Sequence, residues 1–222
     1  MKHIGLFGGT FNPVHFGHLR SAAEVRASFL LDKICFIPSA LPPHKIPSGI
    51  ADANYRLEMT QIAIKGYPEF FVSDVELNRQ GPSYTIDTVK HFQSNQTEPA
   101  FFYLILGLDA FLEIDTWKSF KELFRVIPFI VMTRPGFNYC DNKDKFTVIS
   151  DFLKTKISDG YLFSDKDSGY IHKIYQPVYI LDITPIDISS TNIRMLIKKK
   201  EPVSFLMPQG VELFIKNKGL YI

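Results

Sequence analysis

Apolar residues gather in short runs that alternate with segments of helical periodicity. The first run, residues 3–7, ends at a pair of glycines and predicts a buried strand followed by a tight loop. From Gly17 onward the apolar positions fall at helical spacing, and a second apolar run follows at 33–38. A strand, a helix and a strand within so short a stretch predict a βαβ unit, which implies a parallel sheet with a right-handed crossover.

The same alternation continues to the end of the chain. Short apolar runs predict strands over 70–74, 101–106, 128–133 and 177–182. Helical spacing predicts helices over about 53–65 and 84–92. The stretch 40–47 carries three prolines and cannot be helical. Strands alternating with helices predict an α/β fold, specifically a doubly wound open parallel sheet covered by helices.

One segment departs from this alternation. Residues 138–175 are polar and rich in lysine and aspartate, and they read as an insertion that carries one helix. The chain has 222 residues, of which 45% are apolar, and this suits one domain with a full core. We therefore expect a single domain over 1–222 with an insertion at about 138–175.

Charge and cysteine usage narrow the functional classes. The formal net charge is +2, and the short basic run 198–200 reads as the solvated end of a helix, so the basic face of a nucleic-acid-binding domain is missing. Cys35 lies in an apolar run and is expected to be a buried free thiol, whereas Cys140 lies in a polar stretch. With no signal peptide and no apolar run long enough to span a bilayer, we expect a cytoplasmic protein. Its oligomeric state stays open.

The loop after the first strand carries the first candidate chemistry. Gly8 and Gly9 allow a tight bend and a close backbone approach to a ligand. His15 and His18 then flank the predicted start of a helix, where free N–H groups and the helix dipole favour a phosphate. Two imidazoles there could donate to phosphate oxygens and stabilise developing charge. Zinc binding by the two histidines is the competing interpretation, but no Asp, Glu or Cys of the motif completes a ligand set.

A second motif lies near the end of the chain, at Ser189, Ser190, Thr191 and Arg194. Hydroxyls ahead of a helix are ordinary N-caps, which explains these residues without any ligand. The same hydroxyls, with an arginine three residues later, could also hold a triphosphate tail, since the guanidinium adds a charge-assisted fork. The sequence of this motif alone leaves both interpretations open.

Together the two motifs resemble those of the nucleotidyltransferase superfamily with the H-x-G-H signature. The first motif reads Gly8-Gly9-Thr10-Phe11-Asn12-Pro13-Val14-His15-Phe16-Gly17-His18, and the second reads Ile188-Ser189-Ser190-Thr191-Asn192-Ile193-Arg194. The resemblance implies a Rossmann-like fold. It also implies that the histidines act at the α-phosphate of ATP while the second motif holds the β- and γ-phosphates. Many members have Asp where this chain has Asn12, so a role that needs a carboxylate there is not implied.

Stretches between the motifs are most similar to the bacterial nicotinate-nucleotide adenylyltransferase family. These stretches are Pro42-Pro43-His44-Lys45, Pro82-Ser83-Tyr84-Thr85-Ile86-Asp87-Thr88, Gly107-Leu108-Asp109-Ala110-Phe111 with Trp117 downstream, and Thr133-Arg134-Pro135-Gly136. The resemblance implies that Lys45, with His44 secondary, contacts phosphate, and that Thr85 contacts the nicotinate end. It implies that Asp109 holds a ribose hydroxyl and Trp117 stacks on the pyridine ring. Taken alone, Asp109 could cap a helix, Trp117 could be a core residue, and Thr85 and Arg134 could be ordinary positions.

These resemblances assign a set of site residues. Expected catalytic residues are His15, His18, Lys45 and Arg194. Expected ATP contacts are Gly8, Gly9, Thr10, Phe11, His15, His18, Gly107, Asp109, Ile188, Ser189, Ser190, Thr191 and Arg194. Expected acceptor contacts are His44, Lys45, Thr85, Asp109, Trp117 and Arg134. No resident metal is expected.

The implied reaction is transfer of the adenylyl group of ATP to nicotinic acid mononucleotide, which gives deamido-NAD and pyrophosphate. Mg²⁺ would accompany the triphosphate. Other acceptors are alternatives: nicotinamide mononucleotide, phosphopantetheine, or a cytidylyl transfer from CTP. An ATP-sensing module without turnover is an alternative from another class.

Overall fold

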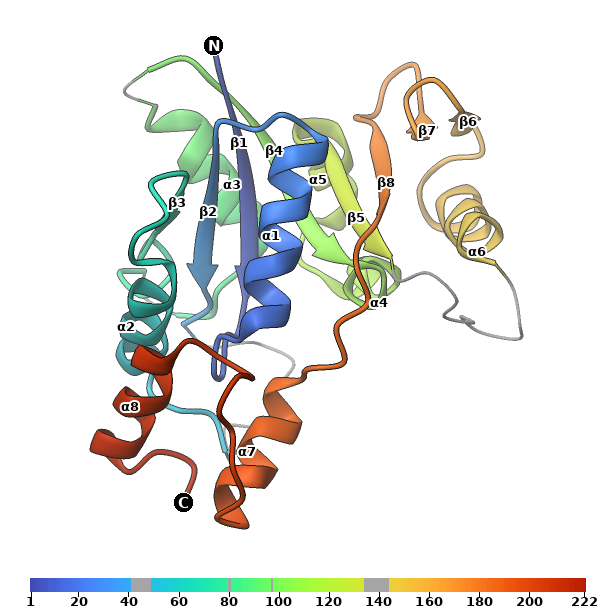
Figure 1. Ribbon diagram of the computed structural model, residues 1–222. Helices are drawn as coiled ribbons and strands as arrows, with labels where there is room; N and C mark the ends of the chain where they lie inside the picture. Colours follow the sequence, from blue (N-terminus) through green and yellow to red (C-terminus); the bar gives the residue numbers. More distant parts are fainter. Residues whose placement is uncertain (41–48, 80, 97, 134–143) are drawn as a thin grey trace. The chain divides into compact units, whose positions relative to one another are not determined.

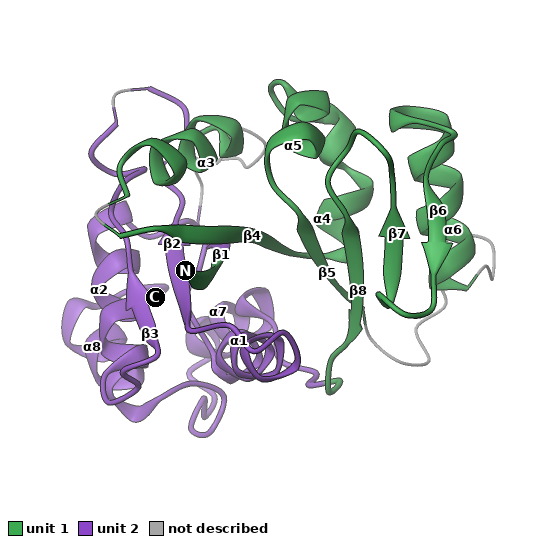
Figure 2. Ribbon diagram, turned by 90° about the horizontal axis from the view of Figure 1, so that it is seen from above, with its two compact units in different colours: residues 1–5, 84–185 green, residues 6–83, 186–222 purple. Residues whose placement is uncertain are grey.

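A computed structural model describes residues 1–40, 49–79, 81–96, 98–133 and 144–222 (Figure 1). The chain forms two compact units (Figure 2). Unit 1 contains residues 1–5 and 84–185, and unit 2 contains residues 6–83 and 186–222. Unit 2 is therefore built from segments near both ends of the chain.

Unit 2 has a small parallel sheet with helices packed on it. Its strands are the end of β1 (Lys2–Gly9), β2 (Lys33–Pro38) and β3 (Phe70–Val72), in the order β3-β2-β1. Its helices are α1 (Phe16–Ser28), α2 (Ala53–Ile64), α7 (Ser190–Lys198) and α8 (Gln209–Lys218). Helix α1 contacts β2, and α2 contacts β2, β3 and α8. The core includes Leu6, Val25, Phe36, Met59 and Val211. Burial of these apolar side chains stabilises the packing of the helices on the sheet.

Unit 1 has a sheet that begins with the first residues of β1, in the order β1-β4-β5-β8-β7-β6. Its strands are β4 (Ala100–Gly107), β5 (Phe129–Thr133), β6 (Leu162–Ser164), β7 (Gly169–Ile171) and β8 (Val178–Asp182). Its helices are α3 (Thr85–Ser94), α4 (Leu108–Leu112), the 3-10 helix η1 (Ile114–Thr116), α5 (Phe120–Val126), α6 (Lys145–Phe152) and the π-helix η2 (Leu153–Ile157). Strand β5 is buried along its whole length between β4 and β8, and this explains its continuous apolar sequence.

The predicted α/β fold is confirmed, but the sheet is mixed and not wholly parallel. Strands β4, β5 and β8 run parallel, whereas β7 is antiparallel to β8 and β6 is antiparallel to β7. The two antiparallel strands belong to the predicted insertion, whose described part also holds α6 and η2. Gly169 permits the close pairing of β7 with β8, because a Cβ there would lie 2.5 Å from the Val178 carbonyl oxygen.

Several expectations from the sequence can be compared directly with the elements. Strand β2 has the predicted bounds, and β3 is shorter than the predicted run 70–74. Cys35 is a buried free thiol, and the lysines 198–200 are exposed at the end of α7, as expected. The loop 40–47 lies outside the described residues except for Ala40. The single-domain expectation stays a prediction. Within the described ranges, none of the helices is long and apolar enough to cross a membrane.

Candidate active site

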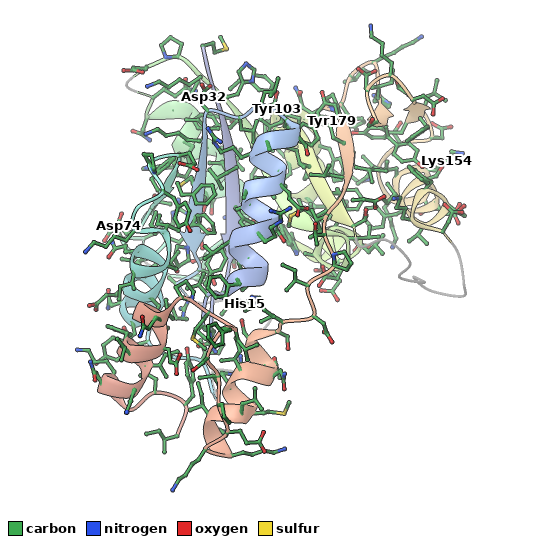
Figure 3. The ribbon with its side chains drawn as sticks, in the orientation of Figure 1. His15, Asp32, Asp74, Tyr103, Lys154 and Tyr179 are labelled. Atoms are coloured by element: carbon green, nitrogen blue, oxygen red, sulfur yellow. The ribbon has the colours of Figure 1, made fainter. Side chains whose placement is uncertain are left out.

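The first motif folds into a compact loop between β1 and α1. His15 is the N-cap residue of α1, and Figure 3 places it at the start of that helix. The His15 and His18 rings are stacked with their centroids 3.7 Å apart, and the Phe11 ring meets the His18 ring edge-on at 5.1 Å. His15 is buried and His18 is partly exposed. The loop therefore holds two imidazoles together at the start of a helix.

The backbone fixes which nitrogen of His18 can donate. The His15 N–H donates to Nδ1 of His18 at 3.3 Å, so Nδ1 is an acceptor. In a neutral imidazole the proton then resides on Nε2. His18 consequently offers an Nε2–H donor at the start of α1, where the helix dipole also favours an anion.

Asn12 links the first motif to more distant parts of unit 2. Its Oδ1 accepts from the Ala51 N–H at 3.0 Å and from the Tyr221 hydroxyl at 2.6 Å, and its Nδ2 donates to the Gly49 carbonyl at 3.0 Å. The side chain is 4% exposed. A buried amide with three hydrogen bonds of good length is well satisfied, so the loop is firmly held at this residue.

The second motif packs directly against the first. The Ser190 hydroxyl donates to the Pro13 carbonyl at 2.8 Å, and Nη1 of Arg194 donates to the Asn12 carbonyl at 2.8 Å. Nη2 of Arg194 also donates to the Thr191 hydroxyl at 3.3 Å. Figures 1 and 2 both show α7 beside the start of α1. Two motifs that are about 180 residues apart in the chain thus form one constellation within unit 2.

Ser189 has the N-cap role that its residue type allows. Its hydroxyl accepts from the Asn192 N–H at 3.1 Å and caps α7. The start of α7 thereby presents backbone N–H groups and the Thr191 side chain next to the Arg194 guanidinium, with no acidic residue in the first helical turn. The capping interpretation and the phosphate interpretation are compatible, because a helix N-terminus is itself a favourable anion site.

Three of the residues expected at the acceptor, Thr85, Asp109 and Trp117, lie in unit 1. Thr85 is the first residue of α3, and Trp117 follows η1 with a partly exposed side chain. Lys118 joins these segments, because its Nζ donates to Asp87 at 3.1 Å and lies 4.5 Å from the centre of the Tyr84 ring. The structure therefore brings the Thr85 and Trp117 segments together.

Asp109 is not the cap of the helix that contains it. The N-cap of α4 is Gly107, with no side-chain capping bond, and the Asp109 side chain is exposed. A Cβ at Gly107 would lie 2.6 Å from Oδ1 of Asp109, so the glycine makes room for the carboxylate. Helix capping therefore does not explain why an aspartate lies two residues after the end of β4.

Other expected site residues can be placed only in part. Gly8, Gly9 and Thr10 of the first motif and Ile188 of the second motif lie in unit 2. His44, Lys45 and Arg134 lie outside the described residues, as does Cys140. Across the part of the chain that is described, no group of three or more His, Cys, Asp or Glu residues could hold a metal ion.

Comparisons with known proteins identify the family of the chain. The family model described as "Cytidylyltransferase-like" matches residues 6–196. A curated protein of Desulfatibacillum aliphaticivorans named "Probable nicotinate-nucleotide adenylyltransferase" is 40% identical over 221 residues, which is 99% of each chain. A protein of the same name from Clostridium novyi is 38% identical and is matched over the full length of both chains.

The chain belongs to the nicotinate-nucleotide adenylyltransferase family. Its fold also matches the solved structure of Plasmodium falciparum nicotinic acid mononucleotide adenylyltransferase complexed with NaAD, with a TM-score of 0.73. That match covers 100% of this chain and 98% of the other at 18% identity, so it bears on the fold alone.

Two residues of this adenylyltransferase site gave no signal in the sequence. Arg56 is 1% exposed and donates to three carbonyls, those of Thr10 at 2.8 Å, Ala51 at 2.9 Å and Ala40 at 3.1 Å. It thereby joins the loops that follow β1 and β2 to the start of α2. Burial lowers the pKa of the Arg56 guanidinium, an effect opposed by nearby Tyr221, Asp52 and Glu76. Tyr221 is the second, and it reaches Asn12 from the penultimate position of the sequence.

Proposed function

We propose that this protein transfers the adenylyl group of ATP to the phosphate of nicotinic acid mononucleotide. One observation carries the proposal, namely the direct hydrogen bonds from Ser190 and Arg194 to the loop that presents His15 and His18. Full-length relatives named nicotinate-nucleotide adenylyltransferase support the choice of acceptor.

In the proposed reaction, a phosphate oxygen of the mononucleotide attacks the α-phosphorus of ATP. The new P–O bond forms as the bond between the α-phosphorus and the bridging oxygen breaks, and pyrophosphate leaves with that oxygen. The attacking phosphate is already anionic, so no protein base is needed, and catalysis consists of positioning and charge stabilisation. The products are deamido-NAD and pyrophosphate, which places the protein in NAD biosynthesis.

The two motifs have distinct tasks in this proposal. The Nε2–H of His18, together with His15 and the start of α1, stabilises charge at the α-phosphate. Ser190, Thr191 and Arg194 anchor the β- and γ-phosphates at the start of α7. The guanidinium of Arg194 has five N–H donors. The Asn12 carbonyl accepts from one of them, which leaves others for phosphate oxygens.

The remaining assignments follow the resemblance. Thr85, Asp109 and Trp117 bind the acceptor and its ribose, and Lys45 supplies positive charge to phosphate. Gly107 and Asp109 also contact ATP. Mg²⁺ would accompany the triphosphate and would supply positive charge to the leaving pyrophosphate, and a cation that keeps several water ligands needs few protein carboxylates.

A product assay with a panel of acceptors tests the function. We expect pyrophosphate release from ATP and Mg²⁺ to require an acceptor and to be fastest with nicotinic acid mononucleotide. Nicotinamide mononucleotide, phosphopantetheine, and CTP in place of ATP are the comparison reactions. Faster turnover with the amide would overturn the choice of acceptor, and ATP binding without pyrophosphate release would favour the sensing module.

A further inference from the structure

The end of the chain turns back onto the first motif. Helix α8 ends at Lys218 and is capped by Gly219, which has a left-handed backbone conformation with φ 61°, and Tyr221 is also left-handed with φ 65°. This turn carries the Tyr221 hydroxyl to Oδ1 of Asn12 at 2.6 Å. A cavity of about 500 Å³ beside the turn is lined by Tyr221 together with Arg194 and Lys198 of α7. The phenol therefore lies next to both motifs.

We propose that Tyr221 is a positioning residue for adenylyl transfer. Its hydroxyl fixes the Asn12 side chain and thereby the loop that carries His15. The same loop contains the Asn12 carbonyl, which accepts a hydrogen bond from Arg194. This inference rests on the proposed function. Tyr221 itself contacts no reacting atom in this scheme, so it acts through Asn12.

Asn12 is suited to transmit such an effect. Its Oδ1 accepts from both Tyr221 and Ala51 and its Nδ2 donates to Gly49, while its main-chain carbonyl accepts from Arg194. The next residue, Pro13, accepts from Ser190. A small rotation of the Asn12 side chain would therefore shift both halves of the phosphate site, and transfer reactions are sensitive to displacements of about 1 Å.

The surroundings of the Tyr221 hydroxyl favour its role as a hydrogen-bond donor to Asn12. Burial raises the pKa of the Tyr221 phenol, and the positive charges of Arg194 and Arg56 oppose that shift. The group therefore remains a neutral donor at physiological pH, and a neutral donor matches the amide oxygen that it contacts.

A structural role alone must be separated from positioning, and Tyr161 provides the matched control. Its hydroxyl donates to the Gln176 carbonyl at 2.8 Å within unit 1, and burial raises its pKa as well. Tyr221→Phe and Tyr161→Phe each remove one hydroxyl oxygen from a shielded hydrogen bond. If both tyrosines are only structural, the two substitutions should behave alike.

Steady-state kinetics and thermal unfolding of both variants test the proposal. We expect similar small decreases in Tm, since each variant loses one hydrogen bond. We expect kcat/KM for ATP to fall about tenfold in Tyr221→Phe and to stay unchanged in Tyr161→Phe. The KM for the mononucleotide should change less than about twofold, because Asn12 and Arg194 are placed at the triphosphate. Equal activity in the two variants would overturn the proposal.

A double-mutant cycle identifies the route of the effect. In an Asn12→Ala background, Tyr221→Phe should cause no further loss of kcat/KM, because the partner of the hydroxyl is already gone. A full, additive loss in that background would contradict transmission through Asn12. If Asn12→Ala does not fold, the comparison of the two tyrosine variants decides on its own.

Calorimetry with ATP separates this inference from the proposed function. A wild-type protein that binds ATP but adenylylates none of the acceptors would refute the function. The Kd for ATP would still test Tyr221, with an increase expected in Tyr221→Phe and none in Tyr161→Phe. An unchanged Kd in both variants, in a protein without turnover, would refute the positioning role.

Discussion

Asn12 illustrates how a single residue depends on partners that are distant in the sequence. At this position the chain has a neutral amide that both donates and accepts hydrogen bonds. A carboxylate could accept from Ala51 and Tyr221 but could not donate to the Gly49 carbonyl. The residue type was evident from the sequence, but its partners lie 37, 39 and 209 residues away, so no local pattern could indicate them.

For the site residues too, the residue types predicted the chemistry, whereas the geometry depends on the fold. The types of His15, His18 and Arg194 indicated phosphate chemistry, because all three side chains donate hydrogen bonds and the guanidinium carries positive charge. The stacking of the two rings and the hydrogen bond from Arg194 to the Asn12 carbonyl depend on how α7 folds back onto the loop. Arg56 was not predicted because a lone arginine within a helical pattern is typical of a solvated face, and its three carbonyl partners come from separate loops.

His18→Ala is the sharpest prediction at the scale of one residue. The substitution removes the proposed Nε2–H donor at the α-phosphate, and we expect kcat to fall by about 100-fold or more. The fold should persist, because His18 is partly exposed and α1 remains buried through Ala22 and Val25. Turnover and circular dichroism should be measured together, with the exposed His91→Ala as control. Near-normal turnover in His18→Ala would refute the proposed role.

Elements with continuous apolar sequences were predictable, and elements held by tertiary contacts were not. Strand β5 is buried throughout, so its sequence alone indicates a strand. Strands β6 and β7 expose Leu162 and Ile171 and consist of three residues each, so they show no strand pattern. The pairing of β7 with β8 requires Gly169 to approach Val178 closely, and a contact between separate strands leaves no local pattern in the sequence. The short helices α4 and α5 were missed for a related reason, since a few residues cannot establish a helical period.

Asp182 joins three elements of unit 1 and gives a prediction at their scale. Lying at the end of β8, it accepts a hydrogen bond from Thr133 of β5 at 2.6 Å and forms an ion pair with Lys145 of α6. Partial burial raises the pKa of this carboxyl, but the hydrogen bonds from Lys145 and Thr133 and the charge of Lys145 outweigh it. The net pKa is therefore lower than the usual 3.8.

Asp182→Asn should destabilise the protein in a pH-dependent manner. A carboxyl whose folded pKa is depressed contributes stability above its unfolded pKa and loses it as pH falls through the folded pKa. The pair is partly solvated, so we expect a loss of less than about 1 kcal/mol in the free energy of unfolding at pH 7. Urea unfolding from pH 7 down to about pH 3 should show the difference from wild type shrinking. The exposed Asp165→Asn serves as control, and a difference that is independent of pH would contradict the argument.

At the scale of the whole molecule, the candidate residues divide between the two compact units. Both phosphate motifs lie in unit 2, although one is near the beginning of the chain and the other near its end. Thr85, Asp109 and Trp117 all lie in unit 1. The order of the motifs along the sequence was predictable, but this division was not, because a unit assembled from both chain ends is defined by contacts of long sequence separation.

Hydrogen exchange with each substrate alone tests this division directly. ATP with Mg²⁺ should slow amide exchange at the starts of α1 and α7 in unit 2, where N–H groups would bind phosphate, and in the segment 107–109. Nicotinic acid mononucleotide alone should slow exchange around Thr85 and Trp117. Strands β6 and β7 carry no assigned contact and serve as the internal control, with unchanged exchange in both experiments. Protection around Trp117 by ATP alone, without protection of α7, would reverse the assignment, because a bound ligand stabilises the segments that it contacts in the folded state.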